Sequence, residues 1–433
     1  MSMVKKPHEI QAHYPMLSFI LKWLCISTVI GILIGSASAG FLTSLTFVTA
    51  VREAYPFLLY FLPLAGFLVG LMYHLIGKDV EGGNNLLIDT IHDPREITPF
   101  RMAPLIYIGT IATHLFGGSA GREGTGLQMA GAIADQFSKP FRLTIAERKI
   151  LMIAAIAAGF GSVFGTPLAG ALFALEVYMV GTISYEAVFP AFAAGIIADM
   201  TTRAWNVGHA HNHIAIIPPV TALNILYAVT AGLAFGLCAA LFCKVMDKTS
   251  SFIKSTITFA PLRPLLGGVV IVVLVVMSGT TRYMGLGTQV IAGSFVESLP
   301  WYDPVVKFLM TIITLASGFK GGEVTPLFFI GSTLGNSLAA IIPLPFDLLA
   351  AMGLVAVFAG ASNTPLACIV LGLELFGSEC GIFIAIACIV SYLVSGHNSI
   401  YRKQKIGRAK HLRFQADSGH TIHDINTRKA LRQ

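Results

Sequence analysis

Two short glycine-rich segments each place a carboxyl group between long apolar stretches. GREGTG at residues 121–126 contains Glu123, and GGEVTP at residues 321–326 contains Glu323. Glycine and proline break both segments too often for the middle of a helix, so we expect each to be a loop that opens a helix. GGNNLL at residues 82–87 has the same character. Because ionisable side chains are rare inside membranes, the two glutamates are candidate functional residues.

A helix that begins inside a membrane is suited to holding an anion. Its first backbone N–H groups have no partner within the helix, its dipole is positive at that end, and lipid offers no acceptor. Transporters often hold anionic groups between the starts of broken helices. Close packing of small residues is the alternative interpretation, and it suits Gly161, Gly165, Ala169 and Gly170 in an otherwise featureless run.

Glu123 could itself act as the anion at such a helix start. An ionised carboxylate would occupy the site and a protonated one would be released, which makes a gate worked by a proton. Glu323 stands near Lys320 at the matching place later in the chain, so we expect a second station on the proton route. The alternative for each acid is a structural ion pair or a helix cap. For Glu176 and Glu374, at the ends of apolar runs, we favour a structural role at the membrane interface.

The composition identifies a membrane protein. The chain has 433 residues, of which 55% are hydrophobic and 12% charged, and its mean hydropathy is +0.74. Several uncharged runs reach or approach the ~18 to 20 residues that a spanning helix needs, and with the shorter stretches they predict roughly ten to a dozen membrane helices. Residues 15–50 are long enough for more than one helix, and no cleavable signal peptide is expected. The main runs are residues 150–175, 264–281, 324–346, 348–373 and 381–401.

The net charge of +7 is concentrated at the two ends of the chain. Lys5 and Lys6 precede the first apolar run, and basic residues are dense from Arg402 onward. Basic cytoplasmic flanks of a membrane protein explain this pattern better than a nucleic-acid partner does, so both termini are expected in the cytoplasm.

The sequence gives no strong indication of a metal site. The six cysteines lie in apolar stretches without C-x-x-C spacing. HAHNH at residues 209–213 is rich in imidazole but has no neighbouring acid or cysteine, so a solvated loop is favoured over a zinc site. His114 lies seven residues before Gly121 and could belong to a proton path, although a lone histidine in an apolar segment is more often packed.

The chain contains an internal repeat. GREGTGLQMAG at residues 121–131 aligns with GGEVTPLFFIG at 321–331, and five of the eleven positions are identical. GTPLAGALFALE at residues 165–176 aligns in the same way with NTPLACIVLGLE at 363–374. Twofold repetition in a polytopic chain is typical of transporters, whose halves often insert in opposite orientations around a site at the midplane.

The segment around Glu123 resembles the gating motif of the CLC family of anion channels and anion/proton antiporters. The family motif G-[KR]-E-G-[PT] matches residues 121–125, GREGT. This resemblance implies an all-α polytopic membrane protein with two inverted-topology repeats of tilted and re-entrant helices, forming homodimers with a separate anion path in each subunit. It also implies that Glu123 is the gate and that Gly121, Arg122, Gly124 and Thr125 take part in anion binding.

Two departures from the chloride-type pattern resemble the fluoride/proton antiporter branch of that family. The usual G-S-G-I-P loop reads GGNNL at residues 82–86, so Asn84 replaces a serine that touches the anion. The usual G-x-F-x-P loop reads GEVTP at residues 322–326, which places Glu323, Val324 and Thr325 at the second helix start. Tyr401 resembles the tyrosine that closes the inner side of the site. Fluoride needs strong hydrogen-bond donors, and Asn84 and Thr325 supply an amide and a hydroxyl.

Three functions are compatible with these features. The first is a fluoride/proton antiporter that exports fluoride, the second a chloride-selective channel or chloride/proton exchanger of the same fold, and the third an intramembrane enzyme with paired acids. The enzyme is disfavoured because no nucleophile with a nearby base is evident. The expected partners are fluoride, protons and a lipid bilayer, without a cofactor, in the inner or plasma membrane. The expected organisation is a cytoplasmic segment at 1–14, a membrane domain at 15–401 with repeats near 15–200 and 220–401, and a basic cytoplasmic tail at 402–433.

Overall fold

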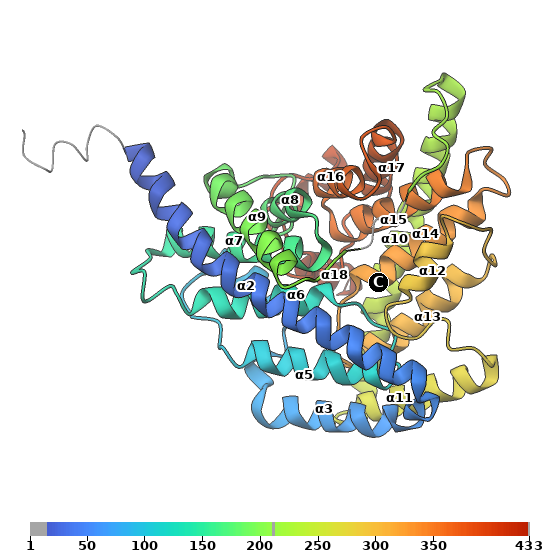
Figure 1. The fold of residues 1–433 in the computed structure, drawn as a ribbon, viewed down its shortest axis with the longest axis horizontal. Helices are drawn as coiled ribbons and strands as arrows, with labels where there is room; N and C mark the ends of the chain where they lie inside the picture. Colours follow the sequence, from blue (N-terminus) through green and yellow to red (C-terminus); the bar gives the residue numbers. More distant parts are fainter. Residues whose placement is uncertain (1–14, 210–212, 432–433) are drawn as a thin grey trace, which may run out of the picture.

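The computed structural model describes residues 15–209 and 213–431, and nearly all of its regular structure is helical. Figure 1 shows the long helix α2 crossing the molecule over the helices of the first half. The first half contains α2 (Pro15–Ala54), η1 (Pro56–Phe61), α3 (Leu62–Ile76), η2 (Lys78–Val80), α4 (Asn84–His92), α5 (Met102–Leu115), α6 (Glu123–Asp135), α7 (Ile145–Phe164), α8 (Pro167–Glu176), β1 (Met179–Val180), η3 (Tyr185–Ala187) and α9 (Val188–Ala204).

The second half repeats the succession of helices around the second glycine-rich segment. It is followed by a short folded tail that begins after Tyr401. These elements are α10 (Ala222–Thr256), α11 (Leu262–Ser278), α12 (Thr288–Gly293), α13 (Asp303–Ala316), α14 (Val324–Leu338), α15 (Phe346–Ser362), α16 (Pro365–Phe376), α17 (Gly381–Val394), β2 (Lys405–Ile406), η4 (Leu412–Asp417) and α18 (Ile422–Leu431).

Two of the long apolar runs are each broken into a pair of helices. Gly165 ends α7 with a φ of 74°, and Asn363 ends α15 with a φ of 60°. Both residues adopt the left-handed conformation that stops a helix, and a proline two residues later begins the next one. The second helix of each pair is short, at 10 residues for α8 and 12 for α16.

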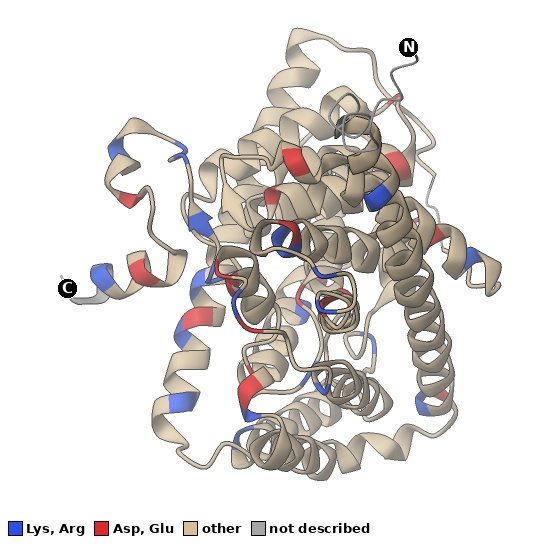
Figure 2. Cartoon of the chain, turned by 90° about the vertical axis from the view of Figure 1, so that its left-hand side faces the viewer, with Lys and Arg blue, Asp and Glu red and all other residues tan. Residues whose placement is uncertain are grey.

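The prediction of roughly ten to a dozen helices of spanning length was therefore too simple. Among the described residues, three helices are long and apolar enough to cross a membrane, and six further apolar helices are shorter. Charged side chains are sparse along most of these helices, as Figure 2 shows. Breaks at glycine, asparagine and proline produce half-length elements that hydropathy alone does not separate.

The possibility of more than one helix in residues 15–50 was wrong, because α2 is a single helix of 40 residues. The glycines of α2 do not interrupt the helix, because they allow the neighbouring helix α9 to pack closely against it. A Cβ atom on Gly35 would lie 2.4 Å from the Ala198 carbonyl oxygen, and one on Gly31 would lie 2.8 Å from Ile197. At about 1.5 Å per residue, α2 is about 60 Å long, so it must tilt or extend beyond a bilayer core of about 30 Å.

The two halves are joined by a reciprocal pair of helix caps. Glu176 at the end of α8 accepts the Ala367 N–H at 2.9 Å at the start of α16. Glu374 near the end of α16 accepts the Ala169 N–H at 2.8 Å at the start of α8. The same contact made in both directions requires a pseudo-twofold axis, and it makes the two helices antiparallel, as inverted repeats demand. Figure 1 shows α8 and α16 together at one end of the molecule.

The tail after Tyr401 is folded against the membrane domain. Strands β1 and β2 pair in parallel, with Met179 opposite Lys405. A small apolar cluster of Val180, Ile406, Ile422 and Ile425 lies beneath α18. The Arg402 guanidinium also pairs with Asp247 of α10 at 2.6 Å. The tail thereby fixes the backbone that immediately follows Tyr401.

Candidate functional site

The three glycine-rich segments begin helices that meet at one place. Helix α4 begins at Asn84, α6 at Glu123 and α14 at Val324, as their loops predicted. Gly121 and Gly322 form an antiparallel bridge with N–O distances of 2.7 and 2.9 Å. A Cβ atom on Gly124 would lie 3.0 Å from the Asn84 amide nitrogen and 3.1 Å from the Gly322 Cα atom. All three helix starts are therefore within a few ångströms of one another.

The Glu123 carboxylate lies across the beginning of α14. Its side chain is fully buried and accepts hydrogen bonds from the Thr325 hydroxyl and from the Thr325 N–H at 3.1 Å. It also accepts the Arg122 N–H at 3.1 Å, while the Arg122 Nε atom is 3.8 Å away. A carboxylate thus occupies the donors of a helix start, which is the position of an anion in such a site.

Glycine is required at this contact because the carboxylate lies against the backbone. A Cβ atom on Gly121 would be 2.7 Å from the Glu123 Oε2 atom and 2.9 Å from the Pro326 ring. Either distance is shorter than real side chains tolerate. The glycine before Arg122 therefore makes room for the carboxyl group itself.

The remaining predicted residues surround this contact in different ways. Tyr401 is 2% exposed, and its hydroxyl has no hydrogen-bond partner among the described residues; the same holds for the Asn84 carbonyl oxygen. Glu323 occupies the N-cap position of α14 without a side-chain capping bond, is partly exposed, and interacts electrostatically with Tyr401, as Glu123 does. Val324 is buried at the first position of α14.

Thr125, which is expected to take part in anion binding, has a side chain that is already engaged within the protein. Its hydroxyl is hydrogen-bonded to the Thr110 hydroxyl of α5 at 2.6 Å. The side chain therefore links α6 to α5, whereas that of Thr325 donates to the Glu123 carboxylate. The threonines of the two repeats match in sequence but have different partners.

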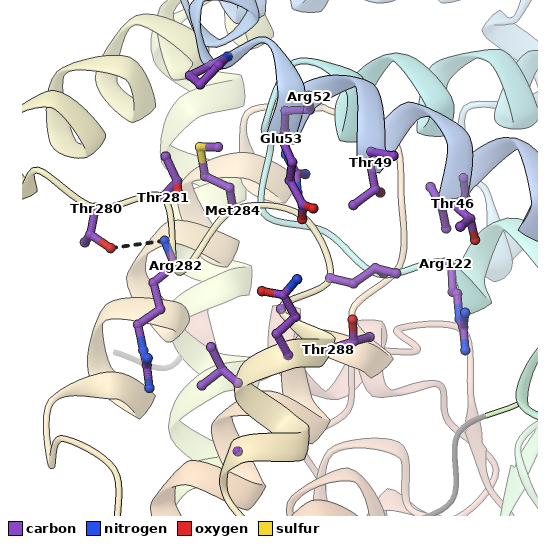
Figure 3. A pocket seen from close by; sticks show the side chains of 18 of the residues that line it. Thr46, Thr49, Arg52, Glu53, Arg122, Thr280, Thr281, Arg282, Met284 and Thr288 are labelled. Carbon is purple, nitrogen blue, oxygen red and sulfur yellow. Dashed lines mark hydrogen bonds and ion pairs between the residues drawn. The ribbon is translucent and has the colours of Figure 1, made fainter.

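A cavity of about 770 Å³ lies beside the gate loop. Figure 3 shows Thr46, Thr49, Arg52 and Glu53 along α2 on one side of it, with Arg122 at its edge. Arg282 also lines it, but its guanidinium pairs with Asp303 at 2.7 Å. Arg122 lines the cavity and its Nε atom lies 3.8 Å from the Glu123 carboxylate, so the cavity adjoins the residues of the site.

Sequence reasoning missed several contacts that build the site. The partners of Thr110 and His114 follow from the tertiary packing of α5 on α6, and no sequence motif marks them. The capping role of Glu176 and Glu374 was signalled by the repeat alignment, since two acids end matching runs. HAHNH includes residues 210–212, which lie outside the described residues. Elsewhere in the described chain, no group of three potential metal ligands is present.

The comparison with known families decides the relationship. The model of the voltage gated chloride channel family matches residues 65–396, well over half of the chain. The chain belongs to the CLC family. The CLC family consists of membrane-embedded transporters and channels, and the described fold is accordingly that of a helical polytopic membrane protein with CLC architecture.

Individual relatives of this CLC protein cover most of its length. It is 50% identical over 419 residues to a protein of Pseudomonas syringae pv. tomato named chloride/fluoride channel protein, covering 95% of this chain and 92% of the relative. The solved structure of a CLC-type fluoride/proton antiporter is similar with a TM-score of 0.86 and 34% identity, covering 93% of this chain and all of that one. A slow cyanobacterial Cl−/H+ antiporter shares the fold with a TM-score of 0.75 at 19% identity.

Proposed function

We propose that this CLC protein is a fluoride/proton antiporter that exports fluoride from the cytoplasm while protons enter. The observation that supports it most is the Glu123 carboxylate on the Thr325 N–H and hydroxyl. These groups are strong donors at a helix start, and fluoride is the halide that most needs them. The resemblance to a fluoride/proton antiporter points to the same substrate.

The exchange follows from competition for one set of donors. When a proton binds the Glu123 carboxylate, the group loses its charge and the hydrogen bonds from Thr325 and Arg122 weaken. Fluoride then takes these donors and the neutral side chain moves away. When fluoride leaves, the carboxylate releases its proton on the other side and returns to the donors. One group and one ion alternate at one site, so movement of either is tied to the other.

Asn84, Glu323 and Tyr401 form the inner part of the proposed site. The buried oxygen of Asn84 and the hydroxyl of Tyr401 have no partner among the described residues, and the Asn84 amide nitrogen lies beside Gly124. The Asn84 amide and the Tyr401 hydroxyl are donors suited to an anion that arrives from the cytoplasm. Glu323 has no salt bridge in the described part of the chain, and we propose it as the second proton-binding group.

Gly121, Gly124 and Val324 are proposed to contribute backbone alone. The Gly121 N–H is bonded to the Gly322 carbonyl, so Gly121 contributes the close approach of the backbone. Gly124 and Val324 lie at the starts of α6 and α14, where N–H groups are unpaired within the helix. The Thr125 N–H belongs to the same set, although its hydroxyl is engaged by Thr110. We propose no enzymatic activity, metal or organic cofactor.

We also propose a homodimer in a cell inner membrane or plasma membrane. The family relationship supports this proposal. The neighbouring helices α16 and α17 also expose apolar side chains, namely Leu366, Ile382, Ile389 and Leu393. Cross-linking through cysteines introduced at Ile389 in the membrane would detect the dimer, and exclusively monomeric protein would refute it.

Transport in liposomes tests the proposal against its chloride alternative. Vesicles with purified protein are loaded with fluoride or chloride, and halide efflux and proton uptake are recorded together. The proposal expects faster fluoride efflux accompanied by proton uptake. Chloride efflux that equals or exceeds fluoride efflux would establish the alternative, a chloride channel or exchanger of this fold.

The variant Glu123→Gln tests the gate in the same vesicles. Glutamine keeps the size of the side chain but cannot exchange a proton, so fluoride-driven uphill proton uptake is expected to disappear. Glu53→Gln is a matched control, because Glu53 lines the cavity on α2 but makes no contact with Thr325. Proton uptake that persists in Glu123→Gln would remove this residue from the proposed cycle.

A further inference from the structure

The ring of His114 is completely buried near the end of α5, and both of its nitrogens face carbonyl oxygens. The Nδ1 atom is 2.9 Å from the Thr110 oxygen and the Nε2 atom is 3.0 Å from the Ala120 oxygen. A neutral imidazole has one N–H donor and one acceptor nitrogen, so it can donate to only one of these carbonyls. A protonated ring has two N–H groups and can donate to both.

The second carbonyl belongs to the loop that carries the gate. Ala120 precedes Gly121, whose backbone is bridged to Gly322 beside the Glu123 carboxylate. The neighbouring loop residues have partners of their own: the Gly118 N–H donates to the Thr113 carbonyl, and the Ser119 N–H donates to the Thr314 hydroxyl. The His114 ring is thus the side chain that faces the Ala120 carbonyl, while the next carbonyl, that of Gly121, accepts the Gly322 N–H.

His114 also connects this loop to the cavity beside it. Its own carbonyl oxygen accepts a hydrogen bond from the Arg52 guanidinium at 3.1 Å, and Arg52 lines the cavity. One turn earlier, Thr110 holds Thr125 of α6. The segment 110–114 therefore contacts α6 through Thr110 and the loop that precedes α6 through the imidazole.

We propose that His114 is a positioning residue for Glu123. Its ring donates to the Ala120 carbonyl, and it can donate to the Thr110 carbonyl at the same time only when it carries a proton. In the neutral state the ring donates to at most one of these two carbonyls. In the protonated state the ring donates to the Ala120 carbonyl of the loop and, at the same time, to the Thr110 carbonyl of its own helix. This proposal rests on the proposed antiport, because its consequence is a change in how strictly fluoride and proton movement are linked.

The charges around the ring come from several elements. Arg52 and Lys307 are the cations that interact with it electrostatically, and both oppose a second positive charge. Further charged or titratable groups on the elements packed near it include Glu53 of α2, Tyr73 and His74 of α3, Arg122 and Glu123 at the start of α6, and Lys320, whose side chain lies against Gly109 of α5.

Two substitutions separate positioning from simple packing. His114→Ala removes the donor and leaves the Ala120 carbonyl buried without it, so displaced positions of the loop become roughly fivefold to thirtyfold more populated. Fluoride efflux without proton uptake should rise accordingly. His114→Gln keeps an amide donor near the place of Nε2 but does not titrate. It should restore coupling at alkaline pH and should lack the gain in coupling that the proposal expects of the wild-type protein on acidification.

The measurement is the ratio of fluoride efflux to proton uptake in liposomes over a range of pH, for wild type and both variants. His74→Gln is the control, since that histidine is exposed on α3. Size-exclusion profiles establish that each variant is folded. Wild-type protein without any coupled flux would refute the antiport, independently of His114. With coupling present in wild type, a glutamine variant as leaky as the alanine variant, or one with the wild-type pH profile, would overturn the role of His114.

Discussion

The hydroxyl of Thr325 offers a sharp test of competition at the gate. Thr325→Val removes this hydroxyl and keeps the side-chain shape and the backbone N–H. In the structure the hydroxyl donates to Glu123, and in the proposed cycle it donates to fluoride when that carboxylate is absent. Both ligands carry a negative charge, and a hydrogen bond to a charged group contributes about 1.5–3 kcal/mol. Since about 1.4 kcal/mol is a factor of ten, fluoride binding weakens by roughly 10- to 100-fold.

The effect on KM should depend on pH because the carboxylate loses the same bond. In the proposed cycle, acidification favours the state in which protonated Glu123 has left the site, so fluoride binds without a competitor and the full loss raises KM. At alkaline pH the Glu123 carboxylate competes with fluoride, and its own binding to these donors has been weakened by a similar amount in Thr325→Val. The two losses then largely cancel, and KM of Thr325→Val approaches that of the wild type.

The measurement is the initial rate of fluoride transport at several fluoride concentrations, at one acidic and one alkaline pH. It gives the ratio of the variant KM to the wild-type KM at each pH. Thr333→Val is a matched control in the same helix, because its hydroxyl donates to the Phe329 carbonyl of α14 and not to the gate. An equal increase in KM at both pH values would show that fluoride and Glu123 do not share this donor. An unchanged KM at acidic pH would show that the hydroxyl does not reach fluoride.

Three further predictions concern the second acid, the helix caps and the tail. Glu323→Ala should abolish fluoride transport in liposomes while the protein remains folded, and normal rates would make Glu323 structural. Glu374→Gln weakens the cap on the N–H groups of Leu168 and Ala169 and should lower the free energy of unfolding by about 1–2 kcal/mol in thermal unfolding. An effect no larger than that of the exposed control Glu379→Gln would contradict this. Ile422→Ala opens the apolar cluster beneath α18 at a cost of about 2–5 kcal/mol and should expose the tail to protease; protection equal to that of the exposed Leu412→Ala control would refute it.

The helix starts were predictable from sequence because glycine and proline have strong local effects. The segments GREGTG and GGEVTP predict loops that open helices, and Glu123 and Val324 are the first residues of α6 and α14. The repeat was also readable, since matching acids end matching runs. Both inferences depend on neighbours in the chain, which sequence reading treats well.

The contacts across the site were not predictable because they join distant segments. Nothing local distinguishes Thr125, bonded to Thr110, from Thr325, bonded to Glu123. The single long helix α2 was misjudged for the same reason, since its glycines are explained by the approach of α9. Similarly, the fold of the tail depends on pairing between Lys405 and Met179, which are far apart in sequence.

The partner of Thr125 explains why two related repeats form one gate. A strictly symmetric site would place Glu323 on the start of α6 as Glu123 lies on the start of α14. The Thr125 hydroxyl is already engaged by Thr110, whereas the matching position 310 in the second repeat is a methionine with no hydroxyl to offer Thr325. Thr325 is therefore available to the carboxylate. A hydroxyl on α5 thus distinguishes the two repeats, and Glu123 lies on the start of α14 while Glu323 stands at the N-cap position of that same helix.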